Sequence, residues 1–231
     1  MTLVLLHGFM DSPVTWDLVL PRLPKGTLAP DVGTLDADAV EAWLDERGID
    51  AAHLAGNSAG GYLALQLAER GRALSVVALA PAGGWAEGST EPDETLAWQR
   101  RIHRTLQHVD PVSAVATPAG RRLATRWLTE RWEHIPAALL TEQLRAAAGT
   151  DVDTAIERAL RERWPLDPGR ITCPLRIVWG LADRILPWPE AAVRYRGMFP
   201  HADWIELEDV GHCPQLDVPL ETAELILGLS A

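Results

Sequence analysis

The sequence predicts an α/β protein in which short buried strands alternate with amphipathic helices. Apolar runs such as Thr2–Leu6 and Leu175–Trp179 are bounded by glycine, a pattern typical of buried parallel strands. Helical patterns follow most of these runs, which implies a doubly wound, mostly parallel sheet with helices on both faces. At 231 residues and 47% hydrophobic residues, the chain is long enough to bury a substantial core.

Local signals place the individual elements. The expected strands are Thr2–Leu6, Thr27–Ala29, Ala51–Ala55, Leu74–Ala80, Leu175–Trp179 and Trp204–Leu207. Ser12 offers a helix N-cap with Pro13 at the first helical position. Asp36 or Asp38 can cap a second helix, which we expect to close at Gly48. The other expected core helices run from 61 to about 71, from about 189, and over 220–229.

Strand–helix alternation stops between Gly83 and about Pro165, where helical patterns alone are found. This segment carries 11 basic and 12 acidic residues and five of the ten tryptophans, which are Trp85, Trp98, Trp127, Trp132 and Trp164. Its place between two strands predicts that it lies over the carboxyl edge of the sheet. We therefore expect a core formed by residues 1–82 and 166–231, and an inserted helical cap formed by residues 83–165.

Composition narrows the class of partner. The formal net charge of −11 argues against a nucleic acid or an anionic membrane surface. Cys173 and Cys213 match no zinc or redox spacing, so we expect no metal and no cofactor. No basic region precedes the apolar Leu3–Leu6, and no apolar run is long enough to span a bilayer. The sequence thus predicts a soluble, cytoplasmic monomer or homodimer that acts on a small molecule.

A serine at the apex of a strand–turn–helix unit is the strongest chemical signal. The stretch Gly56-Asn57-Ser58-Ala59-Gly60 follows an apolar run and opens a helical pattern, as the nucleophile elbow G-x-S-x-G requires. The serine of such a turn adopts backbone angles that most residues avoid, and the glycines leave room for strand and helix to pack. The helix N-terminus offers N–H groups to an oxyanion. Ser58 is therefore the candidate nucleophile.

A serine becomes nucleophilic when a base takes its proton and a carboxylate orients that base. Asp183 follows the strand that ends at Trp179, and His212 follows the last strand. Both should emerge at the same sheet edge as Ser58, in the chain order Ser, Asp, His. Weaker candidates for the acid are Glu208, Asp209 and Asp217.

The reaction also needs donors for an oxyanion. A His-Gly-Phe sequence at 7–9 follows the first strand, and the backbone N–H of Phe9 can pair with that of Ala59. We expect His7 to hydrogen-bond its own loop rather than to act as a second base. Cys213 has no base of its own and is expected to be inert.

Taken together, these motifs resemble those of the α/β-hydrolase family over nearly the whole chain. The matching stretches are the oxyanion loop at 7–9, the Gly-Asn-Ser-Ala-Gly-Gly elbow at 56–61, the Trp-Gly-Leu-Ala-Asp loop at 179–183 and the Gly-His-Cys-Pro-Gln loop at 211–215. The resemblance implies an eight-stranded sheet beneath a helical cap. Because the chain begins at what corresponds to the third strand of the family, we expect about six strands, without the two N-terminal ones.

Three functions remain open from the sequence. The first is a serine hydrolase that cleaves an ester, a thioester or an activated carbon–carbon bond through an acyl-enzyme on Ser58. The second is a lyase using the same residues, since Ser12 and Trp16 after the His-Gly-Phe loop resemble the spacing in a menaquinone-pathway synthase that eliminates pyruvate. The third is a non-catalytic ligand receptor. Serine rather than aspartate at position 58 argues against relatives resembling haloalkane dehalogenases and epoxide hydrolases.

Overall fold

The computed structural model describes residues 2–33 and 36–230. Within these ranges a single sheet has five strands, all parallel, in the order β1-β2-β3-β4-β5. The strands are β1 Leu3–Leu6, β2 Ala52–Asn57, β3 Ala73–Leu79, β4 Leu175–Gly180 and β5 Asp203–Leu207. The predicted α/β class is confirmed.

The expectation of six strands is wrong for the part of the chain that the structure describes. The missing strand is the one expected at Thr27–Ala29, which forms only a single parallel bridge between Leu28 and Val4. The Leu28 N–H donates to the Leu3 carbonyl at 2.9 Å. Pro30 follows directly and lacks the N–H that would extend the ladder, so pairing stops after one bridge.

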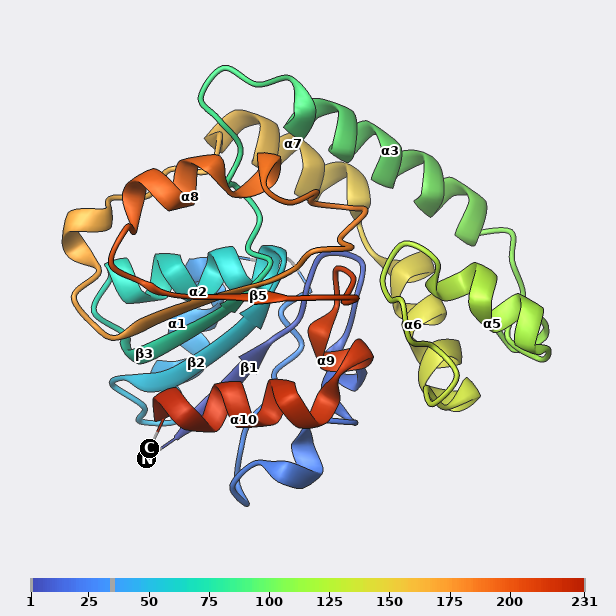
Figure 1. Cartoon of the computed structure of the whole chain (residues 1–231), viewed down its shortest axis with the longest axis horizontal. Helices are drawn as coiled ribbons and strands as arrows, with labels where there is room; N and C mark the ends of the chain where they lie inside the picture. Colours follow the sequence, from blue (N-terminus) through green and yellow to red (C-terminus); the bar gives the residue numbers. More distant parts are fainter. Residues whose placement is uncertain (1, 34–35, 231) are drawn as a thin grey trace.

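Helices cover both faces of the sheet (Figure 1). One face carries α1 Ala37–Asp45, α2 Ala59–Glu69 and α8 Val193–Met198, and the other carries α10 Pro219–Ser230. Successive strand residues point to opposite faces, so Leu54 of β2 packs in the core beneath α1 and α2 while Ala55 packs in the core beneath α10. The doubly wound arrangement follows from strands that are apolar on both sides.

The first expected helix differs from the prediction. In place of one α-helix after Ser12, two 3₁₀ helices form, η1 Pro13–Trp16 and η2 Leu20–Arg22. Pro21 supplies no N–H for an α-helical bond, which favours the shorter turns. The second expected cap is confirmed, because the Asp36 carboxylate accepts a bond from the Asp38 N–H at 2.9 Å.

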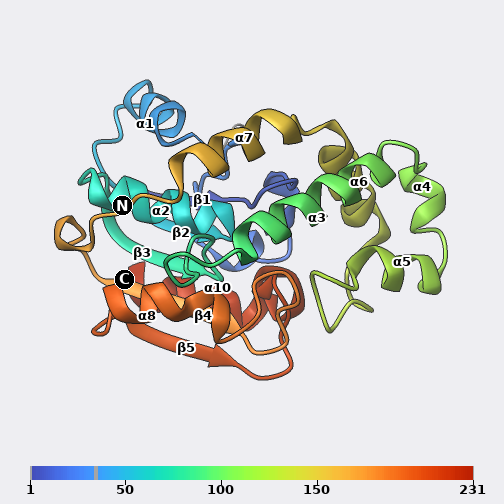
Figure 2. The same ribbon diagram turned by 90° about the horizontal axis from the view of Figure 1, so that it is seen from above.

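Five helices occupy the segment 83–165. They are α3 Glu91–Leu106, α4 Pro111–Ala114, α5 Pro118–Thr125, α6 Ala137–Gly149 and α7 Val152–Glu162. The views in Figures 1 and 2 show α3, α5 and α6 extending past the carboxyl ends of the strands, and α7 beside α3. The expected break near Gly149 is present, since the Asp151 carboxylate caps α7 by accepting from the Thr154 N–H.

The remaining short helices lie near the C-terminal strands: η3 Pro168–Arg170, η4 Glu190–Ala192 and α9 Pro214–Asp217. Across residues 2–33 and 36–230, none of the helices is both long enough and apolar enough to cross a membrane.

Candidate active site

Ser58 lies at a strained turn between β2 and α2. Its φ of 56° and ψ of −121° fall in a region that residues with side chains rarely adopt. A Cβ on Gly56 would collide with the Gly60 carbonyl, and a Cβ on Gly60 would collide with the Leu6 and His7 carbonyl oxygens. The turn can therefore form only with glycine at both positions, as the elbow motif predicts.

Asp183 and His212 meet at the carboxyl edge of the sheet, where they follow β4 and β5. His212 Nδ1 lies 2.7 Å from Asp183 Oδ2, and the Asp183 side chain is fully buried. The other carboxylate oxygen, Oδ1, accepts from the N–H groups of Ile185 and Leu186, each at 2.8 Å. The carboxylate is thus an acceptor on both oxygens, so His212 Nδ1 donates and its Nε2 remains an acceptor.

The weaker acid candidates lie elsewhere. The Asp217 carboxylate accepts from the backbone N–H of Gly211, Glu130 and Arg131. Asp217 therefore ties the histidine loop, residues 208–213 between β5 and α9, to the segment 83–165. Glu208 and Asp209 are exposed. Among the described carboxylates, the one hydrogen-bonded to His212 is that of Asp183.

Asn57 joins the serine turn to the histidine loop. Its Nδ2 donates to the His212 carbonyl at 2.9 Å and to the Leu79 carbonyl at 3.1 Å. Its Oδ1 accepts from Gln215 Nε2 at 3.1 Å. These bonds fix the position of the His212 backbone relative to Ser58. Asn57 and Gln215 lie in the stretches that resemble the family, but these motifs assign a role to neither of them.

The two expected oxyanion donors border Ser58. Ala59 is the first residue of α2, where N–H groups have no partner within the helix. Phe9 and Ala59 line the same small cavity as Ser58. Gly8 brings the loop close, since a Cβ at this position would lie 3.3 Å from Ser58 Cβ. The arrangement suits a negative charge that develops beside the serine.

The surroundings of His7 and Cys213 indicate structural rather than catalytic roles. His7 Nε2 accepts from the Val32 N–H at 3.0 Å, and its Nδ1 lies 2.9 Å from the Gly8 carbonyl. Asp31 Oδ1 also lies 3.3 Å from Nε2, so both ring nitrogens contact nearby loop residues, as expected for a histidine that hydrogen-bonds its own loop. Burial raises the pKa of the Cys213 thiol well above its ordinary value. A thiol kept protonated is a poor nucleophile, as expected for an inert cysteine.

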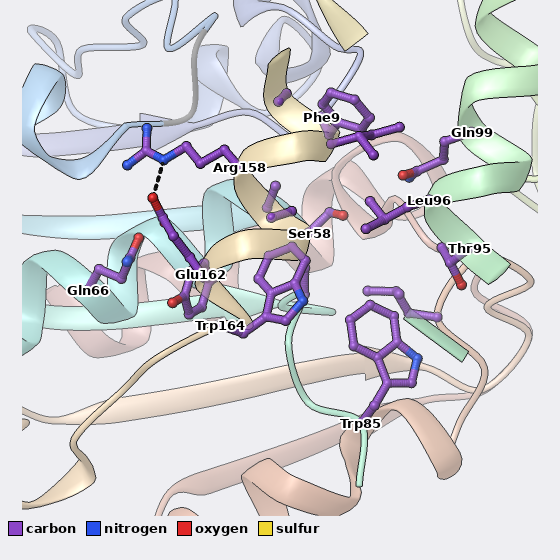
Figure 3. A pocket seen from close by; sticks show the side chains of 17 residues that line it. Phe9, Ser58, Gln66, Trp85, Thr95, Leu96, Gln99, Arg158, Glu162 and Trp164 are labelled. Atoms are coloured by element: carbon purple, nitrogen blue, oxygen red, sulfur yellow. Dashed lines mark hydrogen bonds and ion pairs between the residues drawn. The ribbon is translucent and has the colours of Figure 1, made fainter. Parts of the chain in front are cut away.

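Ser58 lies where two cavities meet. The small cavity has a volume of about 80 Å³ and is walled by Trp85, Leu96 and Trp164, as Figure 3 shows. The large cavity has a volume of about 390 Å³ and is bordered by Trp98, Trp127 and His212. Four of the five tryptophans from the segment 83–165 thus line the space around Ser58.

Sequence comparison identifies the family. A family model described as the alpha/beta hydrolase family matches residues 3–225. The chain belongs to the alpha/beta hydrolase family. The α/β class and the resemblance deduced from the sequence motifs agree with this assignment.

This alpha/beta hydrolase has several known relatives. It is 30% identical to the epoxide hydrolase EphH of Mycobacterium tuberculosis over 82% of this chain and 91% of the relative. It is 27% identical to the pimeloyl-[acyl-carrier protein] methyl ester esterase of Aromatoleum aromaticum over 97% of this chain and 96% of the relative. The solved carboxylesterase CesB of Bacillus subtilis is similar in fold, with a TM-score of 0.69 at 18% identity, over 99% of this chain and 82% of that structure.

The hydrolase also places a carboxyl group in the large cavity that its motifs did not indicate. Asp11 is partly accessible there, and its Oδ1 accepts from the Ser12 N–H at 2.8 Å and from Gln143 Nε2 at 3.1 Å. Gln143 belongs to α6, so this contact links the loop after β1 to the segment 83–165. Burial raises the pKa of the Asp11 carboxyl, although the charge interaction with His7 and the hydrogen bonds from Gln143 and Ser12 oppose the shift.

We expect Asp11→Asn to stabilise the hydrolase at neutral pH. The raised pKa means that the folded state holds the proton of Asp11 more tightly than the unfolded state does. The wild type therefore loses stability as the pH rises from about 4 through the folded pKa, and the uncharged variant does not. At pH 7 to 8 the variant should therefore melt at a higher temperature than the wild type.

Thermal melts of both proteins between pH 4 and pH 8 measure this effect. The two melting temperatures should converge near pH 4. Asp50→Asn, at an exposed position, is the matched control, and its melting temperature should stay close to that of the wild type at every pH. A melting-temperature difference that is constant with pH would contradict the role of the Asp11 charge.

Proposed function

We propose that this protein is a serine hydrolase that cleaves a small ester, a thioester or an activated carbon–carbon bond through an acyl-enzyme on Ser58. One observation carries the proposal. A serine on a strained turn borders the same cavity as His212, and the Nδ1 of that histidine is held by the buried Asp183 carboxylate. These are the three groups that acyl transfer through serine requires.

The first half of the reaction forms the acyl-enzyme. His212 Nε2 takes the proton of the Ser58 hydroxyl as the oxygen attacks the carbonyl carbon. The Asp183 carboxylate stabilises the imidazolium that results, and its bonds to the Ile185 and Leu186 N–H groups keep it oriented. The backbone N–H groups of Phe9 and Ala59 receive the oxyanion.

The acyl-enzyme is complete when His212 gives its proton to the leaving group and the bond between the carbonyl carbon and that group breaks. The second half releases the acid. A water molecule gives a proton to His212 and attacks the acyl carbon, and the bond from that carbon to Ser58 Oγ then breaks as Ser58 takes the proton back from His212. Neither half needs a metal or a cofactor to balance its atoms.

The segment 83–165 is proposed to act as the cap of this site. It contributes Trp85, Trp98, Trp127 and Trp164 to the walls of the two cavities. It also braces the histidine loop, since the Cys213 N–H donates to the Leu128 carbonyl at 2.9 Å. Large aromatic walls favour an apolar or neutral acyl substrate.

The placement of arginines weighs against a lyase that acts on a polycarboxylate. Such a substrate needs at least two cations in the pocket, because a buried unpaired carboxylate costs several kcal/mol. The paired arginines of the segment, at 100–101 and 121–122, line neither cavity. One guanidinium borders each cavity: Arg126 is exposed, and Arg158 is paired with Asp36 and Glu162.

The name of the relative EphH suggests epoxide opening as an alternative. That reaction needs an acid to stabilise the alkoxide formed when the ring opens. A tyrosine hydroxyl could serve as this acid. The hydroxyl groups of the two tyrosines of this chain, Tyr62 and Tyr195, instead donate to the carbonyls of Pro165 and Ala82. The esterase name of the relative from Aromatoleum aromaticum agrees better with the serine at position 58.

We expect p-nitrophenyl acetate and butyrate to be hydrolysed at a rate that depends little on salt, because a neutral ester is not steered by charge. Initial rates between 0.05 and 1 M NaCl should vary by less than about twofold. With a slowly deacylated ester, mass spectrometry of tryptic peptides should show the acyl group on Ser58.

Arg126→Ala should leave these rates within about twofold of the wild type, since the proposed substrate has no charge for it to bind. Absence of ester turnover, together with salt-sensitive binding of a dicarboxylate that Arg126→Ala abolishes, would favour the lyase. Turnover of styrene oxide without ester turnover would favour the reaction for which the relative is named.

A further inference from the structure

The two cavities that meet at Ser58 differ in size and in the catalytic groups that border them. Both are lined by Phe9, Ser58 and Gln99. Ala59 borders the small cavity, whereas His212 borders the large one. The small cavity has about one fifth of the volume of the large one, 80 Å³ against 390 Å³.

We propose that the substrate is an ester or thioester of a short acyl group with a large, mainly apolar alcohol or thiol, the acyl group lying in the small cavity and the leaving group in the large one. This assignment rests on the proposed function, since it assumes attack by Ser58.

The position of His212 decides which part of the substrate occupies which cavity. When the tetrahedral intermediate collapses, the bond from carbon to the leaving oxygen or sulfur breaks, and that atom takes a proton from His212 Nε2. The leaving group must therefore lie on the side of Ser58 that His212 borders, which is the large cavity. The acyl chain diverges from the leaving group at the carbonyl carbon, so it points away from His212 and toward the small cavity.

The walls of the small cavity limit the length of the acyl chain. Trp85 and Trp164 close one side, with ring centroids 6.0 Å apart, and Tyr62 packs edge-on against Trp164 at 5.1 Å. Figure 3 shows these two indoles below Ser58, Phe9 above it and Leu96 to its right. Trp85 is almost fully buried, so the ring has little freedom to move aside.

The large cavity accommodates a bulky apolar group. Helices α3, α5 and α6 contribute apolar side chains to its walls, including Ile102, Leu106, Ala124 and Leu144. Two other helix residues make a matched pair for testing the assignment. Ala147 of α6 lines only the large cavity, and Ala159 of α7 lines only the small cavity.

Two ester series test the assignment with the wild-type protein. In p-nitrophenyl esters from acetate to octanoate, kcat/KM should fall by at least tenfold beyond about four carbons. In acetate esters from ethyl to octyl and 2-phenylethyl, followed by acid release, kcat/KM should rise by at least tenfold. The opposite trends, or no trend in either series, would overturn the assignment.

The matched variants localise the effect. Ala159→Leu should shorten the accepted acyl chain further and leave the preference among alcohols unchanged. Ala147→Leu should reduce kcat/KM for octyl acetate at least tenfold more than it reduces kcat/KM for ethyl acetate. If the two variants exchange these effects, the cavities are assigned the wrong way round.

The proposed function is checked separately with p-nitrophenyl acetate, whose two halves are small enough for either assignment. A burst of p-nitrophenol equal to the enzyme concentration, with acetyl on Ser58, supports the acyl-enzyme whatever the chain-length trends are. Without a burst or labelling, the proposed function itself fails.

Discussion

Ser58→Ala should abolish ester hydrolysis while leaving the fold intact. Removal of the nucleophile prevents the acyl-enzyme, so the rate should fall by roughly 10⁶-fold, and only catalysis by substrate binding and oxyanion donors should remain. Alanine fits the turn as well as serine does, because the strain at φ 56° is a property of the backbone. Steady-state assays with p-nitrophenyl acetate measure the loss, and circular dichroism and thermal melts check the fold.

A fluorophosphonate probe provides the control for this variant. The probe should label the wild type at Ser58 and leave Ser58→Ala unlabelled. Ser12→Ala, on the neighbouring loop, should be labelled like the wild type, since the Ser12 side chain makes no capping bond to η1. Labelling at Cys213 or His7 in place of Ser58 would reject the assignment of the nucleophile.

Asp183→Asn should reduce kcat by roughly 10⁴-fold at neutral pH. The asparagine oxygen can still accept from the Ile185 and Leu186 N–H groups, which directs its amide N–H₂ toward His212 Nδ1. The histidine would then carry its proton on Nε2, the atom that has to accept the proton of Ser58. The fold should survive, since the two backbone hydrogen bonds to position 183 are kept.

Single-turnover rates of acylation measure this effect without interference from deacylation. Asp209→Asn is the matched control, because Asp209 is an exposed carboxylate on the histidine loop and its left-handed backbone suits asparagine. Asp209→Asn should retain the full rate. If Asp183→Asn is fully active and Asp209→Asn is not, the third member of the site is Asp209.

Much of the site could be predicted from sequence because each of its residues lies just after a strand. In a parallel sheet the carboxyl ends of all strands meet at one edge, so Ser58, Asp183 and His212 were expected to converge there although up to 154 positions separate them. The glycines flanking Ser58 reflect local steric limits, which the sequence expresses directly.

These sequence patterns do not predict contacts between loops. Asn57, Gln143 and Asp217 form hydrogen bonds with residues that are distant in the chain. Neither a sequence motif nor a hydrophobic period identifies such pairs. Asp217 is a candidate acid by its place in the sequence, but backbone donors from the segment 83–165 and from Gly211 occupy its carboxylate. The short run Thr27–Ala29 and the family resemblance both predicted a sixth strand, but the proline after Ala29 limits this run to one bridge.

The sequence by itself determined the α/β class, the serine turn and the order of the proposed catalytic residues. These properties depend on hydrophobic period, on glycine sterics and on the polarity of parallel strands, all of which are local or topological. The tertiary structure alone decided which carboxylate holds His212, how Asn57 and Asp11 link the loops, and how the space beside Ser58 divides. Cavity size and hydrogen-bond partners depend on how side chains from separate helices pack together, and no single stretch of sequence encodes that packing.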